Sequence, residues 1–246
     1  MAKILIEGGK PLSGSIKVSG AKNAALPIMA GVILSTEPVR LTNVPALNDV
    51  ETMAKVLQAI GIKSSCLGGN VYQFDASGPV SDEAPYELVK TMRASFFVMG
   101  PLLARLKKAR VPLPGGCAIG VRPVNIHLKG FEALGAQVSI EGGCAVAVAE
   151  NLRGARIILD FPSVGATENL MMAATLAEGR TVIDNAAQEP EIVDLAKFLN
   201  TIGAKIEGAG SPSITIDGVE RLGGGEYRVM PDRIEAGTFA VMGAMT

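Results

Sequence analysis

The sequence predicts an α/β fold made of three repeated units, with buried helices inside a ring and sheets outside it. Two observations predict this architecture. Three amphipathic helix ends each stop at a glycine, and three further helices are apolar around most of their circumference. A helix without a polar face is usually buried, whereas an amphipathic helix covers a core. Three units of strand, buried helix, strand, outer helix and hairpin are expected to fill residues 22–230.

The glycine-stopped helix ends recur along the chain at similar places within each unit. Each combines an apolar pattern of helical period with a glycine that can end the helix, and strand-like residues follow. The strand that leads into the outer helix also repeats, because residues 38–43 resemble residues 181–185. The three helix ends are residues 55–63, 129–137 and 197–205.

The apolar helices are expected over residues 24–34, 87–107 and 166–177. Polar or glycine-rich junctions open three helices of the chain, at residues 19–23, 115–123 and 162–167. Helix N-termini expose unpaired N–H groups and carry a positive partial charge, so they bind anions readily.

If the three junctions are equivalent, Lys22, Arg122 and the N–H groups near Ser163 converge on a site for phosphate or carboxylate groups. Each residue also has a simpler interpretation. Lys22 could be a solvated surface residue, Arg122 a helix start and Ser163 an ordinary N-cap.

Cys117 lies in the glycine-rich junction, with Arg110, Arg122 and His127 near it in sequence. Cationic neighbours and a helix N-terminus favour a thiolate or an easily exchanged proton, so this loop is the predicted centre of chemistry. A Cys–His nucleophilic pair is conceivable, but no motif supports it. The other cysteines, Cys66 and Cys144, are expected to be small buried hydrophobes.

Arg93 lies among apolar residues of the helix expected at 87–107. A cation buried alone is costly, so it needs either a structural carboxylate or a ligand. The pattern does not choose between the two.

Composition excludes several classes of function. The net charge is −1 without a basic stripe, so nucleic-acid binding is not expected. No apolar run has membrane-spanning length, and three widely spaced cysteines fit a reducing cytosol. Phosphate-loop, dinucleotide and metal-ligand spacings are also missing from the sequence. We therefore expect no metal, no cofactor and a cytoplasmic protein.

The two ends of the chain do not fit the three units. Residues 1–21 precede the first unit, and residues 231–246 begin another apolar helix at 234–245 that stops without a cap. We expect the chain to be truncated and this exposed helix to promote self-association.

Five motifs together resemble the UDP-N-acetylglucosamine enolpyruvyl transferases. They occur in the order of that family and span most of the chain. The resemblance implies a fold of two lobes, each a threefold ring, of which this chain is the lobe at 22–230 with remnants of the second at 1–21 and 231–246. The motifs are residues 19–27, 90–95, 113–124, 163–169 and 231–235.

The resemblance also implies a reaction. Enolpyruvate moves from phosphoenolpyruvate to the 3′-hydroxyl of UDP-N-acetylglucosamine and phosphate is released, as the first committed step of bacterial peptidoglycan synthesis. Cys117 would protonate the methylene carbon of phosphoenolpyruvate and react with fosfomycin. Lys22 and Arg122 would hold phosphoenolpyruvate, Asn23 would contact the reacting sugar, and Arg93 would face the diphosphate.

Two stretches would bind the rest of the nucleotide sugar. The first would line the uridine pocket, although Asn125 replaces an aspartate usual there, and the second would meet the diphosphate. The first stretch is Arg122, Pro123, Val124, Asn125 and Ile126, and the second is Ser163, Val164 and Gly165.

The family's second lobe, which carries the base for the sugar hydroxyl, is nearly absent, so this chain alone is expected to lack turnover. Two alternatives are a non-catalytic lobe that binds a nucleotide sugar and a transferase like 5-enolpyruvylshikimate-3-phosphate synthase. The cysteine loop at 114–117 argues against the latter.

Overall fold

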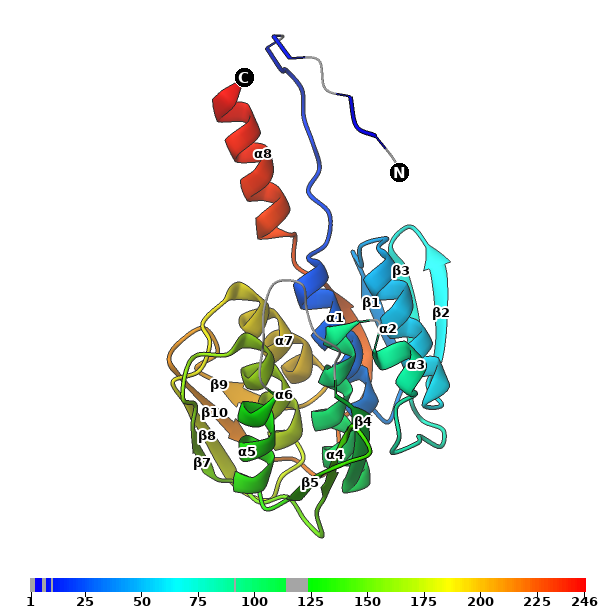
Figure 1. Ribbon diagram of the computed structural model, residues 1–246, viewed down its shortest axis with the longest axis vertical. Helices are drawn as coiled ribbons and strands as arrows, with labels where there is room; N and C mark the ends of the chain where they lie inside the picture. The colour runs from blue at the N-terminus through cyan, green and yellow to red at the C-terminus, as the bar shows by residue number, and fades with distance from the viewer. Residues whose placement is uncertain (1–2, 6–7, 10, 91, 114–123) are drawn as a thin grey trace.

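The computed structural model of the 246-residue chain describes residues 3–5, 8–9, 11–90, 92–113 and 124–246 (Figure 1). Its main body consists of central helices surrounded by three sheets and further helices. One helix near the C-terminus and the extended N-terminal segment project together from one end of this body.

The first unit supplies a central helix, an outer helix and three strands. They are α1 (Lys22–Gly31), which continues into the 3₁₀ helix η1 (Val32–Leu34), then β1 (Val39–Thr42), α2 (Asn48–Ala59), β2 (Lys63–Gly68) and β3 (Val71–Asp75).

The second unit repeats this order after a short additional helix. Its elements are α3 (Tyr86–Val89), the 3₁₀ helix η2 (Arg93–Val98), α4 (Met99–Leu106), β4 (Lys108–Pro112), α5 (Asn125–Ala133), β5 (Gln137–Glu141), β6 (Cys144–Val148) and β7 (Arg156–Ile158).

The third unit follows the same order, and one more strand and helix end the chain. Its elements are α6 (Val164–Ala174), β8 (Arg180–Asp184), α7 (Pro190–Thr201), β9 (Lys205–Glu207), β10 (Ser213–Asp217), β11 (Gly225–Arg228) and α8 (Arg233–Met245).

Two of the three sheets combine strands from two consecutive units, and these shared sheets help to close the ring. The strand orders are β11-β1-β3-β2, β4-β6-β5 and β7-β8-β10-β9. In these two sheets the antiparallel strands come from one unit, whereas the parallel edge strand comes from the unit before. Thus β7 pairs with β8 and β11 pairs with β1, both in parallel. The threefold ring predicted from the repeats is therefore present.

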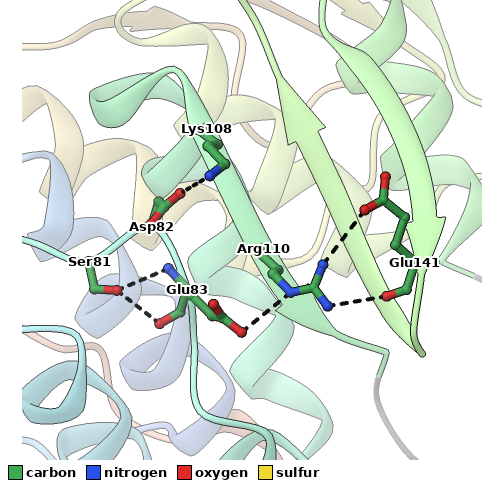
Figure 2. A network of polar contacts seen from close by, with 6 residues as sticks. All are labelled: Ser81, Asp82, Glu83, Lys108, Arg110 and Glu141. Atoms are coloured by element: carbon green, nitrogen blue, oxygen red, sulfur yellow. Dashed lines mark hydrogen bonds and ion pairs between the residues drawn. The ribbon is translucent and has the colours of Figure 1, made fainter.

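The corresponding junction onto the second sheet is a single parallel bridge between Glu83 and Arg110, supported by charges (Figure 2). Arg110 Nε lies 3.3 Å from Glu83 and Arg110 Nη1 lies 3.9 Å from Glu141. Lys108 Nζ lies 2.9 Å from Asp82. These pairs fasten the segment that leaves the first unit to strand β4 of the second.

The central helices α1, α4 and α6 are buried along most of their length, as their all-round apolar sequences predict. Residues 24–31 of α1 and residues 166–174 of α6 are all buried. Helix α6 contacts both α1 and α4. These three helices form the centre of the hydrophobic core.

The prediction of one continuous helix over residues 87–107 is wrong. Helix α3 ends at Val89, Met92 is extended with φ −143° and ψ 115°, and η2 then leads into α4. Pro101 has no N–H group, so it fits the first turn of α4 but would interrupt a helix running from residue 87. The break places Arg93 at a helix start rather than in mid-helix.

The glycines that end the three outer helices are confirmed as left-handed residues, with φ +103° at Gly61, +93° at Gly135 and +111° at Gly203. Each has the same pair of backbone hydrogen bonds. At the first, Gly61 N donates to Gln58 O at 3.0 Å and Ile62 N donates to Leu57 O at 2.9 Å. This satisfies carbonyl groups that a helix end otherwise leaves unpaired.

Helix α8 has no buried residue, and its exposed side chains include Ile234, Val241 and Met245. Its start is well capped, since Asp232 Oδ1 accepts hydrogen bonds from Ile234 N at 2.8 Å and Glu235 N at 3.1 Å. Self-association through this helix stays a prediction. Within the described ranges, no helix is long and apolar enough to cross a membrane.

The three equivalent glycines should tolerate a methyl group unequally. A Cβ at Gly61 would lie 2.4 Å from Pro79 O, whereas at Gly203 the nearest atom would be Leu222 Cδ2 at 3.8 Å. Gly203→Ala should lower the free energy of unfolding by about 1–2 kcal/mol, the cost of the left-handed backbone. Gly61→Ala should cost more, because a backbone clash adds to that strain. Urea denaturation of both variants checks this, and equal losses would contradict it.

Candidate functional site

A cleft of about 690 Å³ lies where α1, α6 and the 3₁₀ helix η2, which leads into α4, begin. Helix α1 contributes Lys22 and Asn23, η2 contributes Arg93, and the start of α6 contributes residues 163–165. The remaining lining residues are Leu26, Asp49, Met92, Ala94, Phe96, Phe97, Val124, His127, Phe161, Pro162, Glu168, Glu189, Glu191 and Arg233.

The predicted set of three equivalent junctions needs one correction. The glycine-rich segment precedes the outer helix α5, whereas Lys22 and Val164 open the central helices α1 and α6. The position in the second unit that corresponds to Lys22 and Val164 is Arg93, at the start of η2. Arg93 is thus the repeat equivalent of the other two helix starts, and the predicted convergence of Arg122 concerns a residue outside the described part of the chain.

The glycine-rich segment is an insertion relative to the other two units. In those units an asparagine in the left-handed region follows the strand, Asn43 with φ 57° and Asn185 with φ 55°. Their side chains donate to Val229 O and Leu159 O, each at 2.9 Å. In those units only residues 43–47 and 185–189 separate the strand from the outer helix, against residues 113–124 in the second unit.

Some predicted site residues lie outside the described part of the chain, namely Cys117, Arg122 and Pro123. The described residues of the predicted uridine stretch lie in three different environments. Val124 lines the cleft, Asn125 is exposed as the first residue of α5, and Ile126 is buried in the core. Ile126 is therefore held by packing on the side of α5 away from solvent.

Ser163 is the N-cap of α6. Its hydroxyl accepts a hydrogen bond from Ala166 N at 3.4 Å, and its own N–H donates to Phe161 O at 2.7 Å. The capping interpretation of Ser163 is thus correct. The first N–H groups of a helix have no intrahelical acceptor, so those of Val164 and Gly165 remain as donors at the cleft. They make the α6 terminus suited to an anion.

Two cations of the cleft are paired with carboxylates at equivalent positions of the repeat. Lys22 Nζ lies 2.9 Å from Asp49, the second residue of α2, and Arg233 Nε lies 3.0 Å from Glu191, the second residue of α7. Sequence reasoning missed Asp49, Glu191 and Arg233 as cleft residues. The repeat itself was the available signal, because both acids stand in the first turn of an outer helix.

The surroundings of the described cysteines and of Arg110 confirm one sequence expectation and correct another. Cys144 is buried as expected, but Cys66 is exposed because it lies on β2, the edge strand of its sheet. The guanidinium of Arg110 is engaged by Glu83 and Glu141 on the second sheet (Figure 2). Its charge therefore has a structural role at that junction.

Two of the buried titratable groups that line the cleft have clearly shifted pKa values. Burial, reinforced by the charge of Arg93, lowers the pKa of His127 to about 4, so its ring is neutral at physiological pH. Burial, reinforced by Glu191 and Glu189, raises the pKa of Glu168 well above its ordinary value. Both carboxyl oxygens of Glu168 are buried without a hydrogen-bond partner. Strongly shifted groups in a cleft are typical of functional sites.

The arrangement suits recognition of an anionic ligand. It combines placed cations, donors at a helix start and apolar walls from Phe97, Phe161 and Val124. Among the residues that the structure describes, no cluster of His, Cys, Asp or Glu could hold a metal ion.

Comparison with known proteins shows which family the chain resembles. Residues 6–246 match the family model described as EPSP synthase (3-phosphoshikimate 1-carboxyvinyltransferase). The chain is 58% identical over 241 residues to a UDP-N-acetylglucosamine 1-carboxyvinyltransferase of Gloeobacter violaceus, covering 98% of this chain and 52% of that protein. It is 59% identical to UDP-N-acetylglucosamine 1-carboxyvinyltransferase 2 of Carboxydothermus hydrogenoformans, covering 98% and 57%. The chain thus spans about half the length of these relatives.

Solved structures share the fold at lower identity. The enolpyruvyl transferase NikO from Streptomyces tendae superposes with a TM-score of 0.83 at 24% identity, covering 95% of this chain and 55% of that one. EPSP synthase from Acinetobacter baumannii gives 0.75 at 19% identity, covering 97% and 54%. The predicted enolpyruvyl-transferase fold is confirmed.

Glu168 should make the stability of the chain depend on pH in a specific direction. Because the pKa of Glu168 is raised on folding, the folded chain binds more protons than the unfolded chain above pH 4.5. Between the unfolded and folded pKa values, the free energy of unfolding therefore falls by up to about 1.4 kcal/mol for each pH unit. Glu168→Gln removes this cost. The free energy of unfolding of the variant minus that of the parent should therefore be larger at pH 8 than at pH 5, as measured by chemical denaturation.

The exposed Glu178 provides the control, since Glu178→Gln should show the same difference at both pH values. A Glu168→Gln difference that is constant or shrinks between pH 5 and pH 8 would contradict the burial of an unpartnered carboxyl group.

Proposed function

The chain belongs to the EPSP synthase (3-phosphoshikimate 1-carboxyvinyltransferase) family, and on that premise we propose that it forms one lobe of a UDP-N-acetylglucosamine 1-carboxyvinyltransferase. That enzyme transfers enolpyruvate from phosphoenolpyruvate to the 3′-hydroxyl of UDP-N-acetylglucosamine and releases phosphate. The reaction belongs to peptidoglycan synthesis, and the proposal includes a cytoplasmic location for the protein.

The observation that carries the proposal is the convergence of three helix starts on one cleft. Lys22, Arg93 and the N–H groups of Val164 and Gly165 face a common volume of about 690 Å³. Both substrates carry several negative charges, and fixed donors and cations stabilise such ligands and the charge that shifts during transfer. The cleft offers this recognition on a chain whose net charge is only −1.

The roles follow the motifs that the chain shares with the family. Lys22 binds phosphoenolpyruvate together with Arg122, and Asn23 lies toward the reacting sugar. Arg93 and the start of α6 bind the diphosphate, and residues 122–126 approach the uridine. With Ile126 in the core, Val124 is the described residue of that stretch best placed to contact a ligand.

In this scheme Cys117 donates a proton to the methylene carbon of phosphoenolpyruvate while the sugar oxygen bonds to the adjacent carbon. The bond from that carbon to the phosphate oxygen then breaks, phosphate leaves, and loss of a proton restores the double bond. The sugar hydroxyl loses its proton to a base that the family places in the second lobe.

Relatedness favours this substrate pair over the shikimate one. Identity is 58% and 59% to the two UDP-N-acetylglucosamine transferases, against 19% to the EPSP synthase structure. A non-catalytic lobe that only binds a nucleotide sugar is the second candidate, because the chain spans about half the length of its relatives.

Calorimetry with UDP-N-acetylglucosamine and with shikimate 3-phosphate distinguishes the two substrate classes. Only the nucleotide sugar should bind, and Arg93→Ala should weaken it roughly tenfold or more, because a charge-assisted contact to phosphate is lost. Arg40→Ala is the matched control, since Arg40 lies on β1 outside the cleft. Binding of shikimate 3-phosphate alone, or equal effects of the two variants, would overturn the proposal.

Fosfomycin labelling followed by peptide mass spectrometry tests the cysteine loop. The adduct should form on Cys117 and be absent in Cys117→Ser, whereas iodoacetamide should also modify the exposed Cys66. Phosphate release by the 246-residue chain should be undetectable, since part of the catalytic machinery is expected in the second lobe. Fosfomycin on Cys66 instead of Cys117, or turnover by this chain, would contradict the assigned roles.

A further inference from the structure

Asn169 lies at the centre of a buried polar network beside the cleft. It stands on α6, and its side-chain amide reaches two other elements, the η2–α4 segment and α5. Its Oδ1 accepts a hydrogen bond from Gly100 N at 2.7 Å, and its Nδ2 donates to Phe96 O at 3.1 Å. The same Nδ2 lies 3.2 Å from Nδ1 of His127, the only histidine of the chain.

The backbone partners fix which way this amide points. Gly100 N–H can only donate and Phe96 C=O can only accept, so a flipped amide would place two donors together and two acceptors together. Asn169 Nδ2 therefore faces His127 as a donor. His127 Nδ1 must accept this hydrogen bond, and the proton of the neutral ring is then on Nε2.

The protonated nitrogen lies on the cleft side of the ring. His127 lines the cleft, and its Nε2 would be 3.8 Å from a Cβ at Gly165, in the first turn of α6. The ring is held edge-on to Phe96, with centroids 5.2 Å apart and an angle of 85°. His127 Nε2–H thus stands beside the free N–H groups of Val164 and Gly165.

We propose that Asn169 is a positioning residue that holds His127 as its Nε2–H tautomer, so that the cleft presents one more neutral donor to a phosphate oxygen of its ligand. Only the identity of the ligand, the diphosphate of a nucleotide sugar, rests on the proposed function. The tautomer follows from the protein alone.

The charges around the ring bear on its protonation. Arg93 on η2 opposes an imidazolium, and Glu168, the nearest acidic neighbour of Asn169 along α6, is itself held toward its neutral form by burial. The ring should consequently remain neutral over the pH range in which exposed histidines titrate.

Long-range ¹H–¹⁵N correlation spectra of the imidazole test the tautomer without any variant, and the single histidine makes the signals unambiguous. Nε2 should carry the proton and Nδ1 should not, between pH 5.5 and pH 8. A protonated Nδ1, or titration with an ordinary histidine pKa, would overturn the proposal. Asn169→Asp, which offers His127 an acceptor, should move the proton to Nδ1.

Ligand titration tests the use of the donor. Adding UDP-N-acetylglucosamine should shift the His127 Nε2–H signal, and His127→Phe should weaken binding roughly tenfold. His127→Gln, whose amide can supply a donor near the Nε2 position, should retain most of the affinity. Circular dichroism and thermal denaturation identify variants that fail to fold. For those variants, the shift of the His127 signal in the parent chain is the test.

The outcomes separate the two proposals. If the nucleotide sugar does not bind the parent chain at all, the proposed function fails while the tautomer assignment is still decided by the spectra. If it binds and His127→Phe binds equally well, the donor role of His127 is wrong and the proposed function stands.

Discussion

The first N–H groups of a buried helix must find an acceptor or face a space that a ligand or water can enter. Three buried helical segments form the centre of this chain, namely α1, η2 with the helix α4 that it leads into, and α6. The starts of α1, η2 and α6 all line the cleft. The ring of sheets closes around them through the parallel pairs β7–β8 and β11–β1. The cleft is therefore a consequence of the repeat, and it is positively polarised before any charged side chain is considered.

Side chains then adjust this polarity. Lys22 and Arg233 add positive charge, but Asp49 and Glu191 offset it at equivalent positions of two units. An incoming anion must compete with these carboxylates, which favours ligands that engage several groups at once over a single free phosphate. His127 contributes a donor without adding charge, because burial keeps its ring neutral. Recognition thus depends on placed groups rather than on a general field.

Local signals in the sequence were sufficient for the repeat but not for its geometry. The glycine at position 61 and its two equivalents could be predicted because a left-handed helix end is a property of a few neighbouring residues. The break before Arg93 could not, since the apolar pattern over residues 87–107 does not mark the extended residue Met92. The contact between Asn169 and His127 joins residues 42 positions apart, and no periodicity predicts such a pair. The cleft roles of the cysteine loop rest on family resemblance alone.

Backbone amide chemical shifts during titration with UDP-N-acetylglucosamine test most directly that the helix starts form the binding site. We predict that the largest changes fall on Val164 and Gly165 at the start of α6, with little change at Thr175, where this helix ends. Changes that concentrate near Thr175, or on an outer sheet, with unchanged signals from Val164 and Gly165, would contradict it.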